Sequence, residues 1–167
     1  MGLWGFVRNI RRDIFQHHYY SDRVRRNAQT VRDMIASGYN PRRDPESPYY
    51  DPKYPPLKNP KPSGVDYGDT KFSLVEMNDY LRGRERMEKR GAKISKLDEV
   101  VKMLLDGQKL PSKYNPHKLH GDMSGLWECH IKGGWKRDNW VLLYTYDYDE
   151  LILYALDTGT HEDCTID

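Results

Sequence analysis

WVLLYTYDYDELILYAL, residues 140–156, decides the fold of this 167-residue chain. Residues 140–146 and 150–156 are rich in apolar and aromatic side chains, which is typical of buried strands. The polar residues 147–149 between these two runs are few enough to form a tight turn. The sequence therefore predicts an antiparallel β-hairpin here.

The residues before the hairpin predict a mixed architecture. Alternating or apolar patterns predict strands at 71–76 and 126–132, and helical patterns cover 77–90 and 95–105. We expect Ser95 to cap the second helix, because Asp98 follows at capping-box spacing. The order is a strand, two helices and an antiparallel meander. This order predicts an α+β domain over residues 69–167.

The residues before this domain differ in character. Apolar spacing predicts an amphipathic helix over 3–15 and a second helix that begins at Ser21 or Asp22 and ends before Gly38. Residues 41–62 hold eight of the ten prolines, which excludes helix and central strand. We therefore expect a helical N-terminal extension over residues 1–40 and a linker rich in Pro and Tyr over residues 41–68.

Composition excludes several classes of protein. No run of 18 apolar residues is present, so no transmembrane segment is expected, and Arg8, Arg11 and Arg12 interrupt any signal-peptide pattern. Two cysteines do not form a disulfide framework, which favours a reduced, cytosolic location. Residues 1–62 carry 12 Lys and Arg against 6 Asp and Glu, whereas residues 63–167 carry 15 against 19. Binding to a polyanion would therefore use local basic patches.

Three histidines of the expected domain suit acid–base chemistry. His117 follows a turn marked by Pro116, His130 lies in the strand 126–132, and His161 follows the hairpin. Imidazole is the side chain that exchanges protons near pH 7 without special tuning. A structural role on the surface remains the alternative for each of them.

Strand alternation separates the residues around His130. Adjacent strand residues point to opposite faces, so Glu128 and His130 share one face, which we expect to be exposed. Cys129 then lies on the core side and is not a nucleophile. No HExxH or CxxC spacing occurs, so no metal site is expected.

Several short stretches carry a resemblance in their order and spacing. They are Ser95-Lys96-Leu97, Leu110-Pro111, Tyr114, His117, Leu119, Gly121, Gly125, Glu128, His130, Trp140 to Tyr144, Leu151 and Thr158-Gly159-Thr160-His161. Over roughly the last hundred residues the chain resembles the YafQ branch of the RelE-like toxins of bacterial toxin–antitoxin systems. The resemblance implies the RelE-like fold and a type II toxin.

The resemblance also implies an activity. Such toxins are ribosome-dependent endoribonucleases, or mRNA interferases, which inhibit translation by cutting mRNA. The 2′-hydroxyl attacks the adjacent phosphorus, and neither a metal nor another cofactor is needed. The implied partners are the ribosome, mRNA and a cognate antitoxin, a DinJ-like ribbon–helix–helix protein. The implied location is the bacterial cytoplasm.

Site residues are carried over by position. The resemblance implies catalytic roles for His117, His130, His161 and Asp138, with Asn139 as the alternative to Asp138 because the loop 133–137 is longer here. The residues implied to bind RNA are Glu128, Lys118, Arg137 and Trp140.

Two departures from the family pattern leave alternatives open. Asp157 stands where the family often has Arg, and the usual aromatic residue near the C-terminus is absent from residues 162–167. The chain is then either an active nuclease or a catalytically decayed RelE-like fold that acts as a binding or regulatory module. A third alternative is a ribosome-independent RNase guided by the basic extension. The extension itself is an arm on the toxin domain that blocks or extends its site, an adaptor to RNA, membrane or protein, or a poorly ordered tail.

Overall fold

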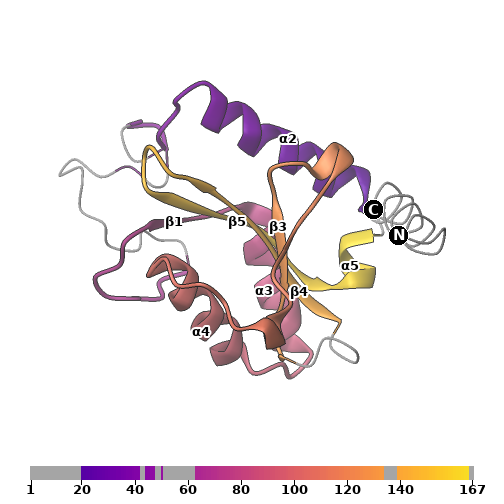
Figure 1. Ribbon diagram of the computed structural model, residues 1–167. Helices are drawn as coiled ribbons and strands as arrows, with labels where there is room; N and C mark the ends of the chain where they lie inside the picture. The colour runs from indigo at the N-terminus through magenta and orange to yellow at the C-terminus, as the bar shows by residue number, and fades with distance from the viewer. Residues whose placement is uncertain (1–19, 42–43, 48–49, 51–62, 134–138, 166–167) are drawn as a thin grey trace, which may run out of the picture.

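The computed structural model describes residues 20–41, 44–47, 50, 63–133 and 139–165 (Figure 1). The expected helix at 3–15 and most of the stretch 41–62 lie outside these residues. The strands are β1 (Ser73–Glu76), β2 (His117–Lys118), β3 (Trp127–His130), β4 (Trp140–Asp147) and β5 (Ile152–Thr160). The α-helices are α2 (Asp22–Ala36), α3 (Asn78–Lys89), α4 (Ile94–Leu105) and α5 (His161–Thr165), and the short 3₁₀ helices are η1 (Ser112–Tyr114) and η2 (Gly121–Met123). The α+β class is confirmed.

The five strands form one sheet in the order β1-β5-β4-β3-β2. The predicted hairpin is confirmed as β4 and β5, which pair antiparallel with Trp140 opposite Thr160. β1 pairs parallel with β5. Parallel pairing requires a crossover, and α3 and α4 supply helices between β1 and the rest of the sheet.

The structure confirms the predicted capping residue of α2 but not that of α4. Ser21 caps α2 as expected, since its Oγ accepts a hydrogen bond from the Val24 amide. The capping box at Ser95 was wrong, because α4 begins at Ile94 and the carboxylate of Asp98 accepts hydrogen bonds from Arg84 and Tyr67 instead. A charged hydrogen bond to arginine is stronger than a cap to a neutral amide, which explains why Asp98 turns away.

The sheet is covered on both faces (Figure 1). In this view α4 lies below the sheet and α3 lies behind the strands, and both helices contribute to a large apolar cluster that includes Cys129, Leu142 and Leu153. α2 lies above it, and its Val24, Ala28 and Val31 pack with residues of β4 and β5 in a second cluster. β2 and α5 were not expected from the sequence, because they are too short to show periodicity.

Within the described residues, no helix is both long enough and apolar enough to cross a membrane. This finding agrees with the absence of apolar runs in the sequence.

Candidate functional site

Three imidazoles surround one buried carboxylate. Oε1 of Glu128 lies 3.2 Å from Nε2 of His161, 3.7 Å from Nε2 of His117 and 3.9 Å from Nε2 of His130. Glu128 is only 4% exposed. The three histidines singled out in the sequence therefore meet at a single oxygen atom.

The sheet register brings these side chains together. His117 on β2 pairs directly with Glu128 on β3, and His130 follows Glu128 by two residues on the same face. His161 is the first residue of α5, and its amide donates to the carbonyl of Asn139 just before β4. Residues 13 and 31 positions apart along the chain thus become neighbours through strand pairing.

Burial and hydrogen bonding oppose each other at Glu128. Burial alone raises the pKa of this carboxyl group, but hydrogen bonds from His161 and Tyr20, and the charges of His161 and His117, bring the pKa below its usual value. The carboxylate is therefore ionised at neutral pH. An ionised acceptor at this position can accept a hydrogen bond from an imidazole N–H group that faces it.

The backbone fixes the tautomer of His117. Its Nδ1 lies 2.8 Å from the carbonyl oxygen of Asn115, and a carbonyl can only accept, so Nδ1 carries the proton. Asn115 adopts a left-handed conformation with φ of 45°, which turns this carbonyl toward the ring. Nε2 of His117 is then the nitrogen that faces Glu128 and exchanges its proton.

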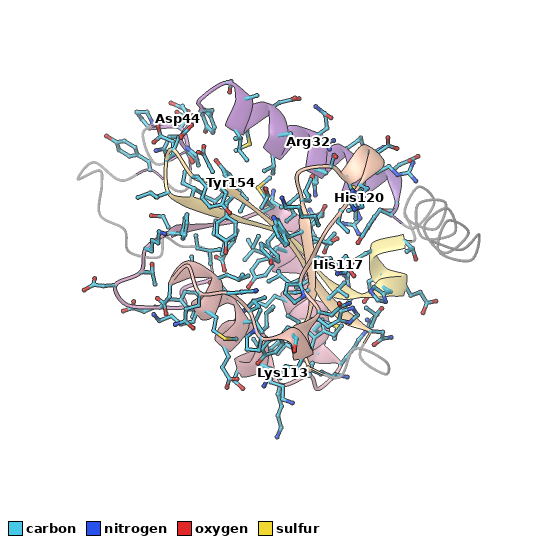
Figure 2. All side chains as sticks on the ribbon, in the orientation of Figure 1. Arg32, Asp44, Lys113, His117, His120 and Tyr154 are labelled. Atoms are coloured by element: carbon cyan, nitrogen blue, oxygen red, sulfur yellow. The ribbon has the colours of Figure 1, made fainter. Side chains whose placement is uncertain are left out.

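The three imidazoles differ in access to solvent. The side chains of His117 and His161 are 34% and 31% exposed, whereas that of His130 is 6% exposed. The His130 ring packs edge-on against the His161 ring at a centroid distance of 5.2 Å. His120, which is labelled with His117 in Figure 2, is exposed and directly precedes η2; no role was assigned to it. Substrate can therefore reach His117 and His161.

Two residues that the resemblance implied to bind RNA, Glu128 and Trp140, are buried. We expected Glu128 and His130 on an exposed sheet face, but both are buried because helices also cover that face of the sheet. Trp140 is 1% exposed and its Nε1 donates to Thr158, so its ring packs in the core and is not available to RNA. Lys118 is exposed, with its ammonium 5.4 Å from the centre of the Trp127 ring. Arg137 and Asp138 lie outside the described residues.

Sequence reasoning missed the contribution of α2. The Tyr20 hydroxyl donates to Oε2 of Glu128, and Arg23 forms ion pairs with Asp79 and Asp157. The sequence did indicate that a cationic partner exists, because Asp157 is a carboxylate in a run of otherwise mainly apolar residues and a buried carboxylate is usually paired. Nothing in the sequence identified Arg23, 134 positions away, as that partner.

An arginine-rich cavity is lined by residues on either side of His161 in the sequence. Its volume is about 640 Å³, and its lining includes Arg82 and Arg86 of α3, Arg90 just after α3, and Thr160 and Asp163. Asp163 accepts hydrogen bonds from Arg90 at 2.7 and 3.0 Å. Asp79, Glu162 and Asp163 also line the cavity, so its arginines are paired in part with carboxylates.

The site also contains donors suited to a metal ion. Glu128, His130 and His161 place one ligand atom each within 4.8 Å of one another. A carboxylate with two imidazoles is a set that divalent transition metals accept. The same atoms suit proton transfer, so the donor set does not by itself distinguish these two chemistries.

Comparison with known proteins identifies the family. Residues 73–165 match the model of the bacterial toxin of type II toxin–antitoxin systems, YafQ. The chain belongs to the YafQ family. Among solved structures, the Escherichia coli DinJ–YafQ toxin–antitoxin complex is similar to this chain with 23% identity and a TM-score of 0.49, covering 56% of this chain and 96% of that one. A metal-bound toxin from Helicobacter pylori gives 25% identity and a TM-score of 0.49, covering 55% and 97%.

No curated protein matches the chain. The YafQ match begins at β1 and ends in α5, so it includes Glu128 and all three histidines. It excludes α2, and with it Tyr20 and Arg23. The YafQ region of this chain is therefore contacted at its site by residues from outside the family match.

Proposed function

We propose that this YafQ family member is a ribosome-dependent endoribonuclease that cleaves mRNA by metal-independent transesterification. The observation that supports it is the group of three imidazoles around the ionised Glu128. RNA cleavage of this kind needs a base, an acid and positive charge near the phosphate, and imidazoles supply all three near pH 7.

The reaction assigns separate tasks to the two exposed histidines. One imidazole removes the proton of the ribose 2′-hydroxyl, whose oxygen then bonds to the adjacent phosphorus. The bond from phosphorus to the 5′-oxygen breaks, and the second, protonated imidazole gives that oxygen its proton. The products are a 2′,3′-cyclic phosphate and a free 5′-hydroxyl. Only RNA carries this internal nucleophile.

Exposure favours His117 and His161 as the acid–base pair. His130 is buried against His161, so we assign it a positioning role, in place of the acid–base role expected from the sequence. The catalytic role of Asp138 and the RNA contacts of Lys118 and Arg137 stay predictions. The arginines of the adjacent cavity add positive charge along which RNA phosphates can bind.

Family membership also supports a partner and a location. A type II toxin is held by a protein antitoxin, and the solved complex of the Escherichia coli relative contains DinJ. We therefore propose a DinJ-like ribbon–helix–helix antitoxin, with the ribosome and mRNA as the targets of the free toxin in the bacterial cytoplasm.

Induced expression in bacteria tests the proposal. The wild-type chain is expected to arrest growth, whereas His161→Ala and His117→Ala relieve arrest and lower cleavage of mRNA on programmed ribosomes by about 10²-fold or more. His120→Ala, which alters an exposed histidine outside the site, is the matched control. Equal toxicity of all four proteins would refute the assignment of the site.

Chelation tests the metal-independent mechanism separately. Cleavage by protein dialysed against EDTA is expected to equal that of untreated protein, provided that ribosome integrity is maintained with magnesium during the assay. Activity that is lost on dialysis and restored by zinc or copper would show that Glu128, His130 and His161 act as metal ligands.

The decayed-fold alternative is supported by one observation. Asp157, which stands where the family often has Arg, is buried and paired with Arg23, so it brings no positive charge to substrate. In that case purified protein leaves ribosome-bound mRNA intact. Cleavage mapped within codons would exclude this alternative.

A further inference from the structure

We propose that Tyr20, outside the family match, is a positioning residue of the site whose hydroxyl orients the Glu128 carboxylate toward the histidines. The inference concerns the same site as the proposed function and rests on it for its catalytic consequence. Its structural content is the hydrogen bond from Tyr20 to Oε2.

The two oxygens of Glu128 have different partners. Oε2 accepts the hydrogen bond from Tyr20, whereas Nε2 of each of the three imidazoles lies 3.2–3.9 Å from Oε1. A carboxylate rotates easily about its last bond, and its two oxygens are chemically equivalent. A donor fixed at one oxygen removes that freedom and keeps the other oxygen directed at the imidazoles.

The position of Tyr20 is fixed by the main chain around it. The amide of Ser21 donates to the carbonyl of Cys164 in α5 at 2.9 Å, and Arg23 donates to the carbonyl of Asp163 at 3.2 Å. α5 begins at His161. The segment that carries Tyr20 is thus attached to the same short helix that carries His161, so both partners of Glu128 are fixed relative to each other.

Burial indicates that the contact is a lasting part of the fold. Tyr20 is 3% exposed, and Val24, Ala28 and Val31 of α2 are at most 1% exposed in the cluster that they share with β4 and β5. Burying apolar side chains favours the folded state, because it removes their surface from water. Release of α2 would expose all of these side chains.

Access to the site distinguishes positioning from blocking. Tyr20 contacts Oε2, while the side chains of His117 and His161 keep about a third of their surface exposed. A residue that blocked the site would instead cover the two imidazoles that substrate must reach. Tyr20 therefore completes the support of Glu128 and leaves the reacting groups open.

The ionisable groups that face Glu128 come from four elements. They are Tyr20 before α2, His117 of β2, His130 of β3 and His161 with Cys164 of α5. Tyr20 is the member of this group that contacts Oε2 and that lies outside the family match. Its hydroxyl can be removed while the histidines are left intact.

The test compares Tyr20→Phe with Tyr154→Phe in the full chain. Both remove a buried hydroxyl from the same apolar cluster, but the Tyr154 hydroxyl has no hydrogen-bond partner among the described residues. Tyr20→Phe is expected to lower kcat on programmed ribosomes about tenfold with KM changed less than twofold. Tyr154→Phe is expected to match wild type. A kcat that rises in Tyr20→Phe would overturn the proposal and indicate an inhibitory contact.

A spectroscopic measurement decides the inference without cleavage. Long-range ¹H–¹⁵N spectra at fixed pH report which nitrogen of each histidine carries the proton. Wild type and Tyr154→Phe are expected to show His161 protonated at Nε2, the atom beside Oε1, and Tyr20→Phe to lose this preference. An unchanged His161 pattern in folded Tyr20→Phe overturns the positioning role. A wild-type chain that cleaves no RNA refutes the proposed function, while the spectra still decide the role of Tyr20.

Thermal unfolding checks that Tyr20→Phe and Tyr154→Phe are both folded when they are compared. Phe preserves the ring that packs in the cluster, so both variants are expected to unfold cooperatively.

Discussion

Glu128 and Asp157 are two buried carboxylates in one cross-strand row, and their pKa values shift in opposite directions. Both lie opposite Leu143, Glu128 from β3 and Asp157 from β5. Tyr20, just before α2, contacts Glu128, and Arg23, in the first turn of α2, contacts Asp157. The pKa of Glu128 lies below its usual value, whereas that of Asp157 is raised to about 6.

The two pKa values differ because the carboxylates have different partners. Burial raises the pKa of both groups, but Glu128 receives hydrogen bonds from His161 and Tyr20. Asp157 shares its cation Arg23 with a second carboxylate, Asp79, whose negative charge raises the pKa further. The comparison teaches that the pKa values of two similarly buried acids can shift in opposite directions, because the groups around them differ.

The largest effect is expected for Glu128→Gln. The amide cannot neutralise an imidazolium, and its NH₂ group faces donors instead of accepting from them. Cleavage on programmed ribosomes should fall about 10²–10³-fold in single-turnover assays. Glu99→Gln, an exposed carboxylate on α4, is the control. A wild-type cleavage rate in Glu128→Gln would show that the ionised carboxylate of Glu128 is not needed for the reaction.

Arg23→Met should have the next largest effect, on stability. It leaves Asp79 and Asp157 without the cation that now lies 2.9 and 3.1 Å from their oxygens. We expect a loss of about 3 kcal/mol in the free energy of unfolding by urea at pH 7. The loss should be smaller at pH 5, where Asp157 can bind a proton. Arg82→Met, which removes an exposed partner of Asp79, should cost less than about 1 kcal/mol.

Asp157→Asn should reveal the raised pKa directly. Because the folded-state pKa of about 6 exceeds the ordinary aspartate pKa of 3.8, the folded wild type binds more protons than the unfolded chain between these values. Wild-type stability should therefore decline relative to Asp157→Asn by about 2 kcal/mol as pH rises from 4 to 7. Urea unfolding at several pH values measures this difference. A constant difference across that range would contradict the raised pKa.

The smallest effect is expected for Asp163→Asn, a carboxylate nearer the surface. Burial raises the pKa of Asp163, but hydrogen bonds from Arg90 and Thr160 outweigh it and lower the pKa to about 2. Its contribution is present above the unfolded value of 3.8 and is lost as pH falls toward 2. Asp163→Asn should cost about 1 kcal/mol at neutral pH after solvent screening, and nothing at the acidic limit. Equal stability of wild type and Asp163→Asn at pH 7 would show that the ion pairs of Asp163 with its arginines do not stabilise the fold.

Much of the fold could be predicted from local patterns. The hairpin, α3, α4 and the start of α2 carry strong periodicity or turn signals, and these elements formed within a few residues of expectation. β2 and α5 could not be predicted, because two-residue and five-residue elements show no periodicity and form only where a neighbour pairs with them.

The candidate site was predictable in its residue types but not in its arrangement. The sequence identified His117, His130 and His161 and placed Glu128 on the face of His130. It placed that face in solvent, since strand alternation separates two faces without saying what covers them. Only the packing of α2 and α5 shows that Glu128 is buried and hence strongly coupled to its neighbours.

The sequence by itself determined the α+β elements, the family and the set of histidines, because these depend on short spacings and local order. Tertiary structure alone decided that Tyr20 and Arg23 meet Glu128 and Asp157, more than a hundred residues away. The physical reason is that desolvation makes a carboxylate depend on whichever donors the fold brings within hydrogen-bond distance, and no local pattern encodes that choice.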